Sequence, residues 1–133
     1  MTFEDLGLCP EIQRAVAELG FDAPMPVQER VIPFLLGDSS HDRVALAETG
    51  SGKTAAFGLP ILNNVEPGFH QIQALVMSPT RELCMQIASD IKRYGKFLPE
   101  VKVVAVYGGE NIVSQYKQLD QQPEILVATP GRL

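Results

Sequence analysis

Short apolar runs alternate with helical segments from about residue 44 to the end of the chain, and this alternation constrains the fold most. The runs are rich in valine, isoleucine and leucine, which is typical of strands buried on both faces. Strands separated by helices form βαβ units and a mainly parallel sheet, so the fold class predicted is α/β. We expect strands at residues 44–47, 72–78, 101–107 and 125–128, and helices at residues 53–65, 81–94 and 111–119.

Two further helices are predicted before the first strand. Pro10 and Gly20 mark the start and the end of one, and Pro26 opens another that ends before Gly37. Pro33 lies inside the second helix and predicts a kink there. No linker or repeat divides the 133 residues, so we expect one domain.

Composition excludes several classes of protein. A net charge of −5 argues against a small basic nucleic-acid binder, although it allows nucleic acid in a local groove. Two cysteines, Cys9 and Cys84, are too few for a disulfide framework or a zinc site. No apolar run approaches the roughly 18 residues of a membrane span, and the first residues do not form a signal peptide. We therefore expect a reduced protein of the cytoplasm (or the nucleus) that does not contact a membrane.

The segment AETGSGKT, residues 47–54, follows a predicted strand and opens a predicted helix. This is the setting of a phosphate-binding loop, in which glycines turn backbone N–H groups toward phosphate at a helix N-terminus. We expect Lys53 to reach the β and γ phosphates of ATP and Thr54 to bind Mg²⁺. The other expected contacts with the nucleotide in this segment are Thr49, Gly50, Ser51 and Gly52. Ala47 stands where the general pattern has glycine, so the assignment rests on the remaining positions.

Two other interpretations compete for this segment. One is a simple glycine-serine turn with an incidental lysine, which the strand–loop–helix setting disfavours. The other is a dinucleotide fingerprint, because residues 50–55 fit G-x-G-x-x-A. That fingerprint needs an acidic residue about 20 positions later, and the next predicted strand ends in Val76, Met77 and Ser78. The phosphate loop is favoured.

With this loop assigned, the chain resembles the DEAD-box family of ATP-dependent RNA helicases. The similar blocks are GFDAPMPVQ at residues 20–28 (the Q motif), AETGSGKT at 47–54 (motif I), PTREL at 79–83 (motif Ia), Gly108-Gly109 (the double glycine) and TPGRL at 129–133 (motif Ib). The phosphate loop is shared by many NTPases, whereas these blocks in this order are specific. A kinase or transporter ATPase would not account for the Q motif or for TPGRL.

The resemblance implies a RecA-like P-loop NTPase with a three-layer fold. Residues 1–37 would form the helical Q-motif region, and residues 38–133 the βα core of the first RecA-like domain. Gln28 would read adenine, because its amide offers donors and an acceptor. Phe21 would pack near the base, together with Phe3, which stands 17 residues before Gly20 where the family carries an isolated aromatic. Core packing of the two phenylalanines, and an exposed helical glutamine, are the alternatives.

The resemblance also implies contact with RNA. Ligands of parallel sheets bind outside the carboxyl ends of strands, where motifs Ia, the double glycine and Ib are expected. Hydroxyls, glycine N–H groups and arginine suit the sugar-phosphate backbone, so binding would be independent of base sequence. The expected contacts are Pro79, Thr80, Arg81, Gly108, Gly109, Thr129, Pro130, Gly131 and Arg132. Each loop taken alone would be an ordinary turn or helix cap.

Several positions depart from the family pattern without removing an assigned group. Met25 stands where threonine is common, and Cys84, where alanine is common, is expected to be a small packed residue. His41 and His70 are expected to be exposed in loops.

The sequence ends at Leu133, directly after the motif Ib block. The family's Asp-Glu-Ala-Asp segment and second RecA-like domain, which complete ATP hydrolysis, are not within it. The resemblance implies a parent that couples ATP hydrolysis to unwinding of RNA duplexes, and we expect the 133 residues alone to be nearly inactive. A non-catalytic module that binds ATP and RNA is the alternative. Unpaired strand edges of a sheet cut at this point would favour self-association.

Overall fold

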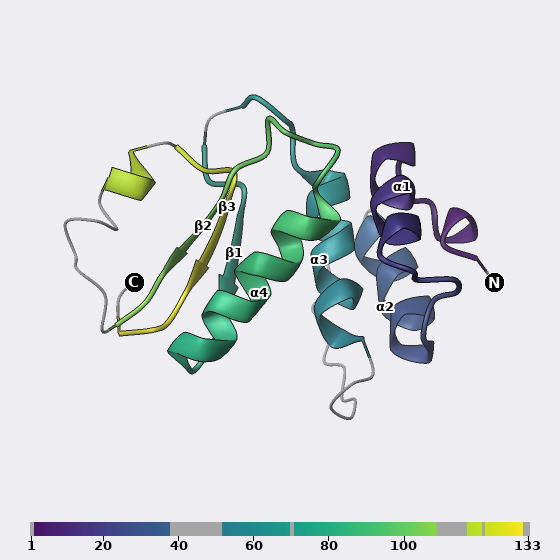
Figure 1. Cartoon of the computed structure of the whole chain (residues 1–133), viewed down its shortest axis with the longest axis horizontal. Helices are drawn as coiled ribbons and strands as arrows, with labels where there is room; N and C mark the ends of the chain where they lie inside the picture. Colours follow the sequence, from purple (N-terminus) through teal and green to yellow (C-terminus); the bar gives the residue numbers. More distant parts are fainter. Residues whose placement is uncertain (1, 38–51, 70, 109–116, 121, 132–133) are drawn as a thin grey trace.

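A computed structural model describes residues 2–37, 52–69, 71–108, 117–120 and 122–131. The described elements are a short 3-10 helix η1 (Glu4–Leu6), the helices α1 (Pro10–Glu18), α2 (Pro26–Leu36), α3 (Lys53–Asn64) and α4 (Arg81–Tyr94), and the strands β1 (Ala74–Met77), β2 (Val103–Val106) and β3 (Ile125–Ala128) (Figure 1). Residues 117–119 are also helical. The strand expected at 44–47, most of the helix expected at 111–119, and both histidines lie outside the described residues.

The helices begin and end where the sequence predicts, within a residue or two. Pro10 and Pro26 occupy the first turns of α1 and α2. Gly20, after α1, has a φ of +82°, a left-handed conformation that favours glycine. The helix α2 continues through Pro33 to Leu36, and the predicted kink there stays a prediction. Thr80 caps α4, where its hydroxyl oxygen accepts the Leu83 N–H at 3.2 Å.

The three strands form a parallel sheet in the order β1-β3-β2, which confirms the predicted α/β class and the mainly parallel pairing. The central strand β3 is buried along its whole length. Full burial of both faces was wrong for β1, where Leu75 and Met77 are 48% and 44% exposed. Leu75 and Met77 share a face of the sheet with the buried Leu126 and Ala128 of β3. Leu119 packs against that buried part, whereas β1 lies at the edge of the described sheet and stays partly exposed.

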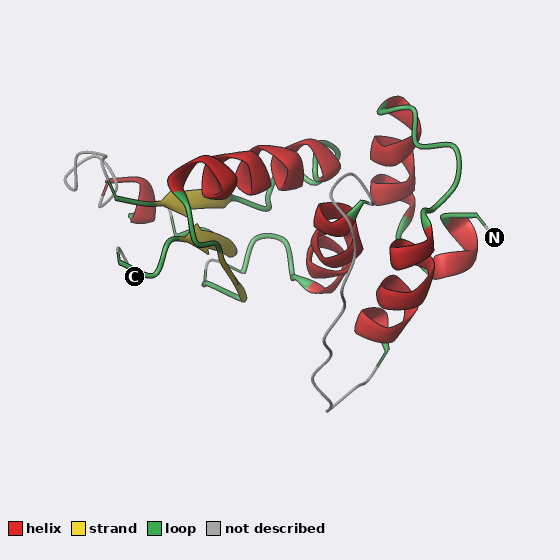
Figure 2. Cartoon of the chain, turned by 90° about the horizontal axis from the view of Figure 1, so that it is seen from below, coloured by secondary structure: helices red, strands yellow, loops and turns green. Residues whose placement is uncertain are grey.

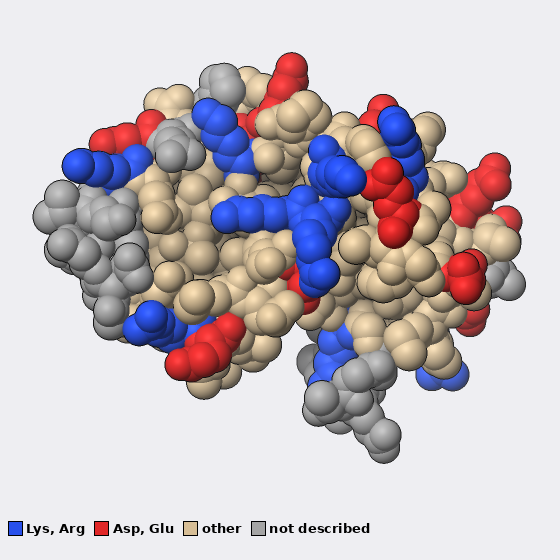
Figure 3. Space-filling view, viewed as in Figure 1, with Lys and Arg blue, Asp and Glu red and all other residues tan. Residues whose placement is uncertain are grey.

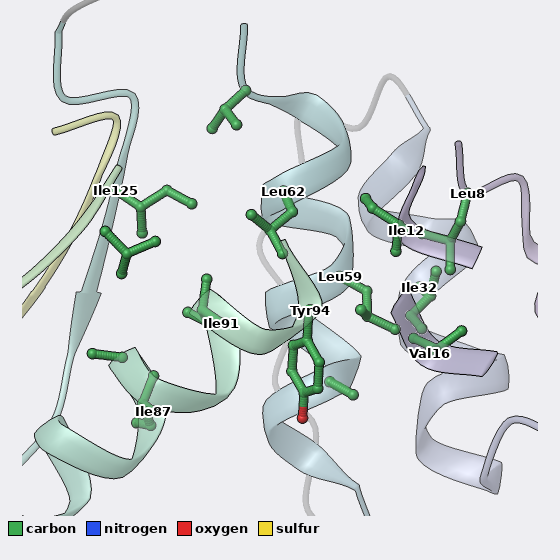
Figure 4. Close-up of a cluster of buried hydrophobic side chains, with 14 of the residues drawn as sticks. Leu8, Ile12, Val16, Ile32, Leu59, Leu62, Ile87, Ile91, Tyr94 and Ile125 are labelled. Atoms are coloured by element: carbon green, nitrogen blue, oxygen red, sulfur yellow. The ribbon is translucent and has the colours of Figure 1, made fainter. Parts of the chain in front are cut away.

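The helix α4 lies over the other face of the sheet, with α3 beside it and α1 and α2 on the far side of α3 (Figure 2). A single buried cluster joins all these layers; Ile91 and Tyr94 of α4 meet Leu59 and Leu62 of α3, which in turn approach α1 and α2 (Figure 4). Gly58 allows this close contact, since a Cβ there would stand 3.3 Å from the Cγ1 atom of Ile91. None of the described helices could span a membrane.

Cys84 is packed inside this core, as predicted. Its side chain has no exposed surface, and its Sγ lies 3.5 Å from the carbonyl oxygen of Val127. Burial raises the pKa of the thiol, which keeps the reactive thiolate scarce.

Candidate nucleotide and RNA site

Gln28, in the first turn of α2, has its side-chain amide buried between two parts of the chain. Its Oε1 accepts the Met25 N–H at 2.9 Å, which closes the N-terminus of α2. Its Nε2 donates to the carbonyl oxygen of Gly52 at 3.2 Å. Because only 3% of the residue is exposed, the alternative of an exposed helical glutamine was wrong. The Q-motif block therefore contacts the end of the predicted phosphate loop directly.

Gly52 is required at this contact for two reasons. Its φ of +85° lies in the left-handed region, where other residues are strained. A Cβ at this position would overlap the amide nitrogen of Gln28 and lie 3.1 Å from the Sδ atom of Met25. The close approach of α2 and α3 thus depends on the absence of a side chain.

Lys53 and Thr54 open α3, so both stand at the positive end of the helix dipole. Lys53 is exposed and Thr54 is half-buried. The preceding positions, Thr49, Gly50 and Ser51, lie outside the described residues. A hydroxyl oxygen is a hard ligand that suits Mg²⁺, which takes its other ligands from phosphate and water. Thr54 therefore fits the metal role predicted for it.

A pocket of about 820 Å³ surrounds these groups. Such a volume is in the range that holds a nucleotide-sized ligand. It is lined by residues of the Q-motif block, the start of α3 and the inner face of α4: Gly20, Phe21, Asp22, Ala23, Met25, Gln28, Gly52, Lys53, Thr54, Ala55, Phe57, Leu83, Ile87, Asp90 and Tyr94. The sequence-predicted residues Phe21, Gln28, Gly52, Lys53 and Thr54 are brought together here.

Phe3 and Phe21 lie side by side, with ring centroids 6.4 Å apart, and Tyr94 approaches Phe21 at 6.2 Å. Phe3 is only 6% exposed and belongs to the core, whereas the half-buried Phe21 lines the pocket. Core packing accounts for Phe3, and Phe21 combines packing with access to a ligand. Burial raises the pKa of Tyr94 to about 12, so its ring stays neutral.

The carboxyl ends of the three strands meet at one edge of the sheet. Ser78, after β1, donates its N–H to the Ala128 carbonyl oxygen at 3.0 Å. Thr129, after β3, donates its N–H to the Val106 carbonyl oxygen at 3.1 Å. The loops that follow β1, β2 and β3 therefore leave the sheet side by side, as the parallel topology predicts.

The loop after β1 presents Pro79, Thr80 and Arg81 at this edge, and all three are exposed. The guanidinium of Arg81 stands 5.5 Å from the centre of the Tyr107 ring, a cation–π distance. The Thr80 hydroxyl caps a helix, which agrees with the alternative that this loop is an ordinary helix cap. The hydroxyl hydrogen remains available to donate.

Gly108, Pro130 and Gly131 are exposed at the same edge, whereas Thr129 is 8% exposed. A Cβ added at Gly108 or Gly131 would meet nothing within 4 Å. The packing of the described chain therefore does not demand glycine there, and the backbone stays open to a ligand. Gly109 and Arg132 lie outside the described residues.

Sequence reasoning missed the contribution of α4 to the pocket. This helix begins in the PTREL block, for which the resemblance implies contact with RNA and not with the nucleotide. Its residues that line the pocket are Leu83, Ile87, Asp90 and Tyr94. Their spacing at three and four residues places them on one face of the helix. This pattern predicts that the face is buried, but not which part of the chain packs against it. Tyr107 was missed as the partner of Arg81, since only the sheet order brings the two residues together.

Known proteins match this fold and these motifs. The sequence model of the DEAD/DEAH box helicase family matches residues 25–133. The chain is 48% identical over 132 residues to the ATP-dependent RNA helicase DeaD of Klebsiella pneumoniae, covering 99% of this chain and 20% of that protein. It is 47% identical over 132 residues to the DEAD-box ATP-dependent RNA helicase RhpA of Helicobacter pylori (strain B128), covering 99% of this chain and 26% of that protein.

Solved structures agree with the sequence matches. A DEAD box protein from the hyperthermophile Methanococcus jannaschii superposes with a TM-score of 0.88 at 39% identity, over 99% of this chain and 35% of that one. Mss116p bound to ssRNA and AMP-PNP gives a TM-score of 0.89 at 32% identity, over 98% of this chain and 27% of that one. The fold is thus that of the RecA-like domains of DEAD-box helicases.

The chain belongs to the DEAD/DEAH box helicase family. It spans about a fifth to a quarter of the length of the curated relatives described above.

Proposed function

We propose that this chain binds ATP with Mg²⁺ and grips the RNA backbone as part of an ATP-dependent RNA helicase. The main support for this proposal is the hydrogen bond from Gln28 to Gly52, which joins the Q-motif block to the proposed phosphate loop. Lys53 and Thr54 line the same pocket. Within that helicase, residues 1–37 form the Q-motif region and residues 38–133 the βα core of the first RecA-like domain.

Gln28 reads the adenine base in this proposal. Its amide has two N–H groups and an oxygen with two lone pairs, and the described residues use one of each. One donor and one acceptor remain for the N6/N7 edge of adenine, while Phe21 offers the base an apolar surface. Thr49, Gly50 and Ser51 complete the phosphate contacts, Lys53 neutralises the β and γ phosphates, and Thr54 binds Mg²⁺.

Replacement of Lys53 tests nucleotide binding. Lys53→Ala removes the only side-chain cation that lines the pocket in the described residues, and ATP affinity should fall by about tenfold or more. Lys92→Ala, an exposed lysine on α4 outside the pocket, is the matched control and should leave the affinity unchanged. Titration with a fluorescent ATP analogue measures both. Equal affinities for the wild type and Lys53→Ala would contradict the proposal.

RNA runs across the carboxyl edge of the sheet in this proposal, against the loops after β1, β2 and β3. Exposed arginine, hydroxyls and open glycine backbone suit phosphate and sugar. Contacts would come from Pro79, Thr80, Arg81, Gly108, Gly109, Thr129, Pro130, Gly131 and Arg132, with the hydroxyl of the mostly buried Thr129 contributing least.

Arg81→Ala tests this edge, with Arg30→Ala on the exposed surface of α2 as the control. Each lost phosphate contact should weaken binding to all RNA sequences alike and make it less sensitive to salt by about one unit of slope. Fluorescence anisotropy with labelled oligo(U) and oligo(A) over a range of salt concentrations gives both quantities. A loss confined to one base sequence, or an equal loss for Arg30→Ala, would exclude this edge as a backbone site.

The helicase reaction itself needs groups outside this sequence. The 133 residues contain no Asp-Glu-Ala-Asp run. Hydrolysis depends on residues that hold Mg²⁺ and orient water. We therefore propose that the 133 residues alone bind ATP but hydrolyse almost none, and a steady-state assay with saturating RNA checks this. Binding without turnover in the longest natural protein that carries this sequence would instead favour the non-catalytic module.

A further inference from the structure

The outer face of α4 carries a second hollow, separate from the nucleotide pocket. It measures about 710 Å³ and lies between α4, the end of α1 and the strand β2. Part of its lining is apolar, from Leu19, Met85, Ala88 and Ala105. None of its lining residues belongs to the pocket around Gln28. The proposed roles in ATP and RNA binding leave this hollow unused.

Cations gather along one side of the hollow, although the whole chain has a net charge of −5. Figure 3 shows lysine and arginine side chains clustered over the C-terminal half of α4. Lys92, Arg93 and Lys96 line the hollow. Arg14 stands close by, with its guanidinium 4.1 Å from the centre of the Phe97 ring, and Lys96 Nζ approaches the same ring at 5.5 Å. We call these four cations the α4 rim.

The α4 rim is only partly neutralised. Arg93 pairs with Asp90 of its own helix, and Lys96 pairs with Glu18 of α1 at 2.9 Å. The Lys96 and Glu18 side chains are 62% and 46% exposed, and exposed pairs of this kind are weak in water. A carboxylate from outside can replace Glu18 at Lys96 with little loss. Lys92 has no ion pair with a carboxylate in the described part of the chain. Its ammonium group can therefore pair with a carboxylate of a ligand.

The combination of an apolar lining and a cationic rim selects the kind of ligand. Non-specific RNA binding relies on backbone charge and on aromatic rings that stack with bases. Tyr107 is the sole aromatic residue in the described lining, and it already holds the Arg81 guanidinium. Aliphatic surface beside lysines suits a peptide that carries both carboxylates and aliphatic side chains.

We propose that the hollow along α4 binds an acidic, aliphatic peptide segment of a partner protein. An aliphatic side chain of the segment packs against Met85 and Ala88. Carboxylates of the segment pair with Lys92 and Lys96, the second of which releases Glu18. Because the hollow shares no residue with the nucleotide pocket, the partner binds without competing for ATP.

The test measures fluorescence anisotropy of a labelled peptide with repeats of Glu-Leu-Asp-Ser against the purified protein. Lys92→Glu combined with Lys96→Glu should weaken binding by about tenfold or more, because like charges then face each other. Met85→Ser should weaken it by roughly fivefold through the loss of apolar contact, and Met85 is exposed enough to leave folding intact. Arg30→Glu, which makes the same change of charge per residue on α2, should change the affinity by less than about twofold.

Three results would overturn the proposal. One is the absence of peptide binding to the wild type. Another is equal binding of a Glu-Ser-Asp-Ser peptide, or an equal loss with Arg30→Glu, either of which would indicate general charge attraction. The third is weakening of oligo(U) binding by the double lysine variant while Met85→Ser changes nothing, which would assign the hollow to RNA. Unchanged circular dichroism and ATP affinity show that each variant remains folded.

Discussion

Gln28 and Gly52 lie 24 positions apart in the chain, and the hydrogen bond between them connects two sequence blocks. The glutamine side-chain oxygen accepts the Met25 N–H at the start of α2, and its nitrogen donates to the Gly52 carbonyl oxygen. The glycine supplies the backbone conformation and the space for this contact. Binding of a base at Gln28 and of phosphate at Lys53 would therefore act on one connected unit.

Gly52→Ala tests this contact. A Cβ would overlap the Gln28 amide in a left-handed backbone, so the free energy of unfolding should fall by about 1–3 kcal/mol. Gly108→Ala is the matched control, because a Cβ there meets no described atom within 4 Å, and it should cost less than about 0.5 kcal/mol. Urea unfolding followed by circular dichroism measures both. Similar losses in the two variants would show that Gly52 has no special role.

Among the helices and strands, the sequence predicted best the segments that have strong local signals at their ends. The bounds of α4 follow from the Thr80 cap and the Gly95 stop, and those of β3 from a short apolar run. The strands β1 and β2 are shorter than predicted, because each pairs with only the four residues of β3. A ladder ends where its partner ends, and local sequence does not contain this information.

The exposure of one face of β1 shows the same limit. Leu75 and Met77 fit a run buried on both faces, but burial depends on which segment covers the strand. In the candidate site, likewise, the motifs identified Gln28, Lys53 and Thr54. The side of the pocket formed by α4 depends on how two helices pack, which no single segment specifies.

We predict that β1 makes the 133-residue chain prone to self-association. Its exposed face and the edge left unpaired in the described sheet can pair with another copy. Leu75→Lys with Met77→Lys should shift the chain toward the monomer, since charges on an edge strand oppose such pairing. Phe69→Lys, an exposed apolar position outside the strand, is the control. Light scattering at high concentration measures the effect, and a stable wild-type monomer would contradict it.

Across the whole molecule, the two candidate sites lie on different sides of one core. The pocket at Gln28 lies between the Q-motif helices, α3 and α4, while the carboxyl edge of the sheet carries the loops proposed for RNA. The helix α4 joins them, because Thr80 and Arg81 start it at the sheet edge and Tyr94 ends it beside Phe21. A nucleotide in the pocket and RNA at the edge would both contact residues of this helix.

If the pocket at Gln28 binds an adenine nucleotide, the affinity of the protein for ATP should exceed its affinity for GTP. Guanine presents an acceptor oxygen where adenine has an amino group. The donor and acceptor of Gln28 that no described residue uses should therefore favour ATP by about tenfold or more. Gln28→Leu should remove most of that preference. Equal affinity of the wild-type protein for ATP and GTP, measured by calorimetric titration with Mg²⁺ present, would contradict the recognition of adenine by Gln28.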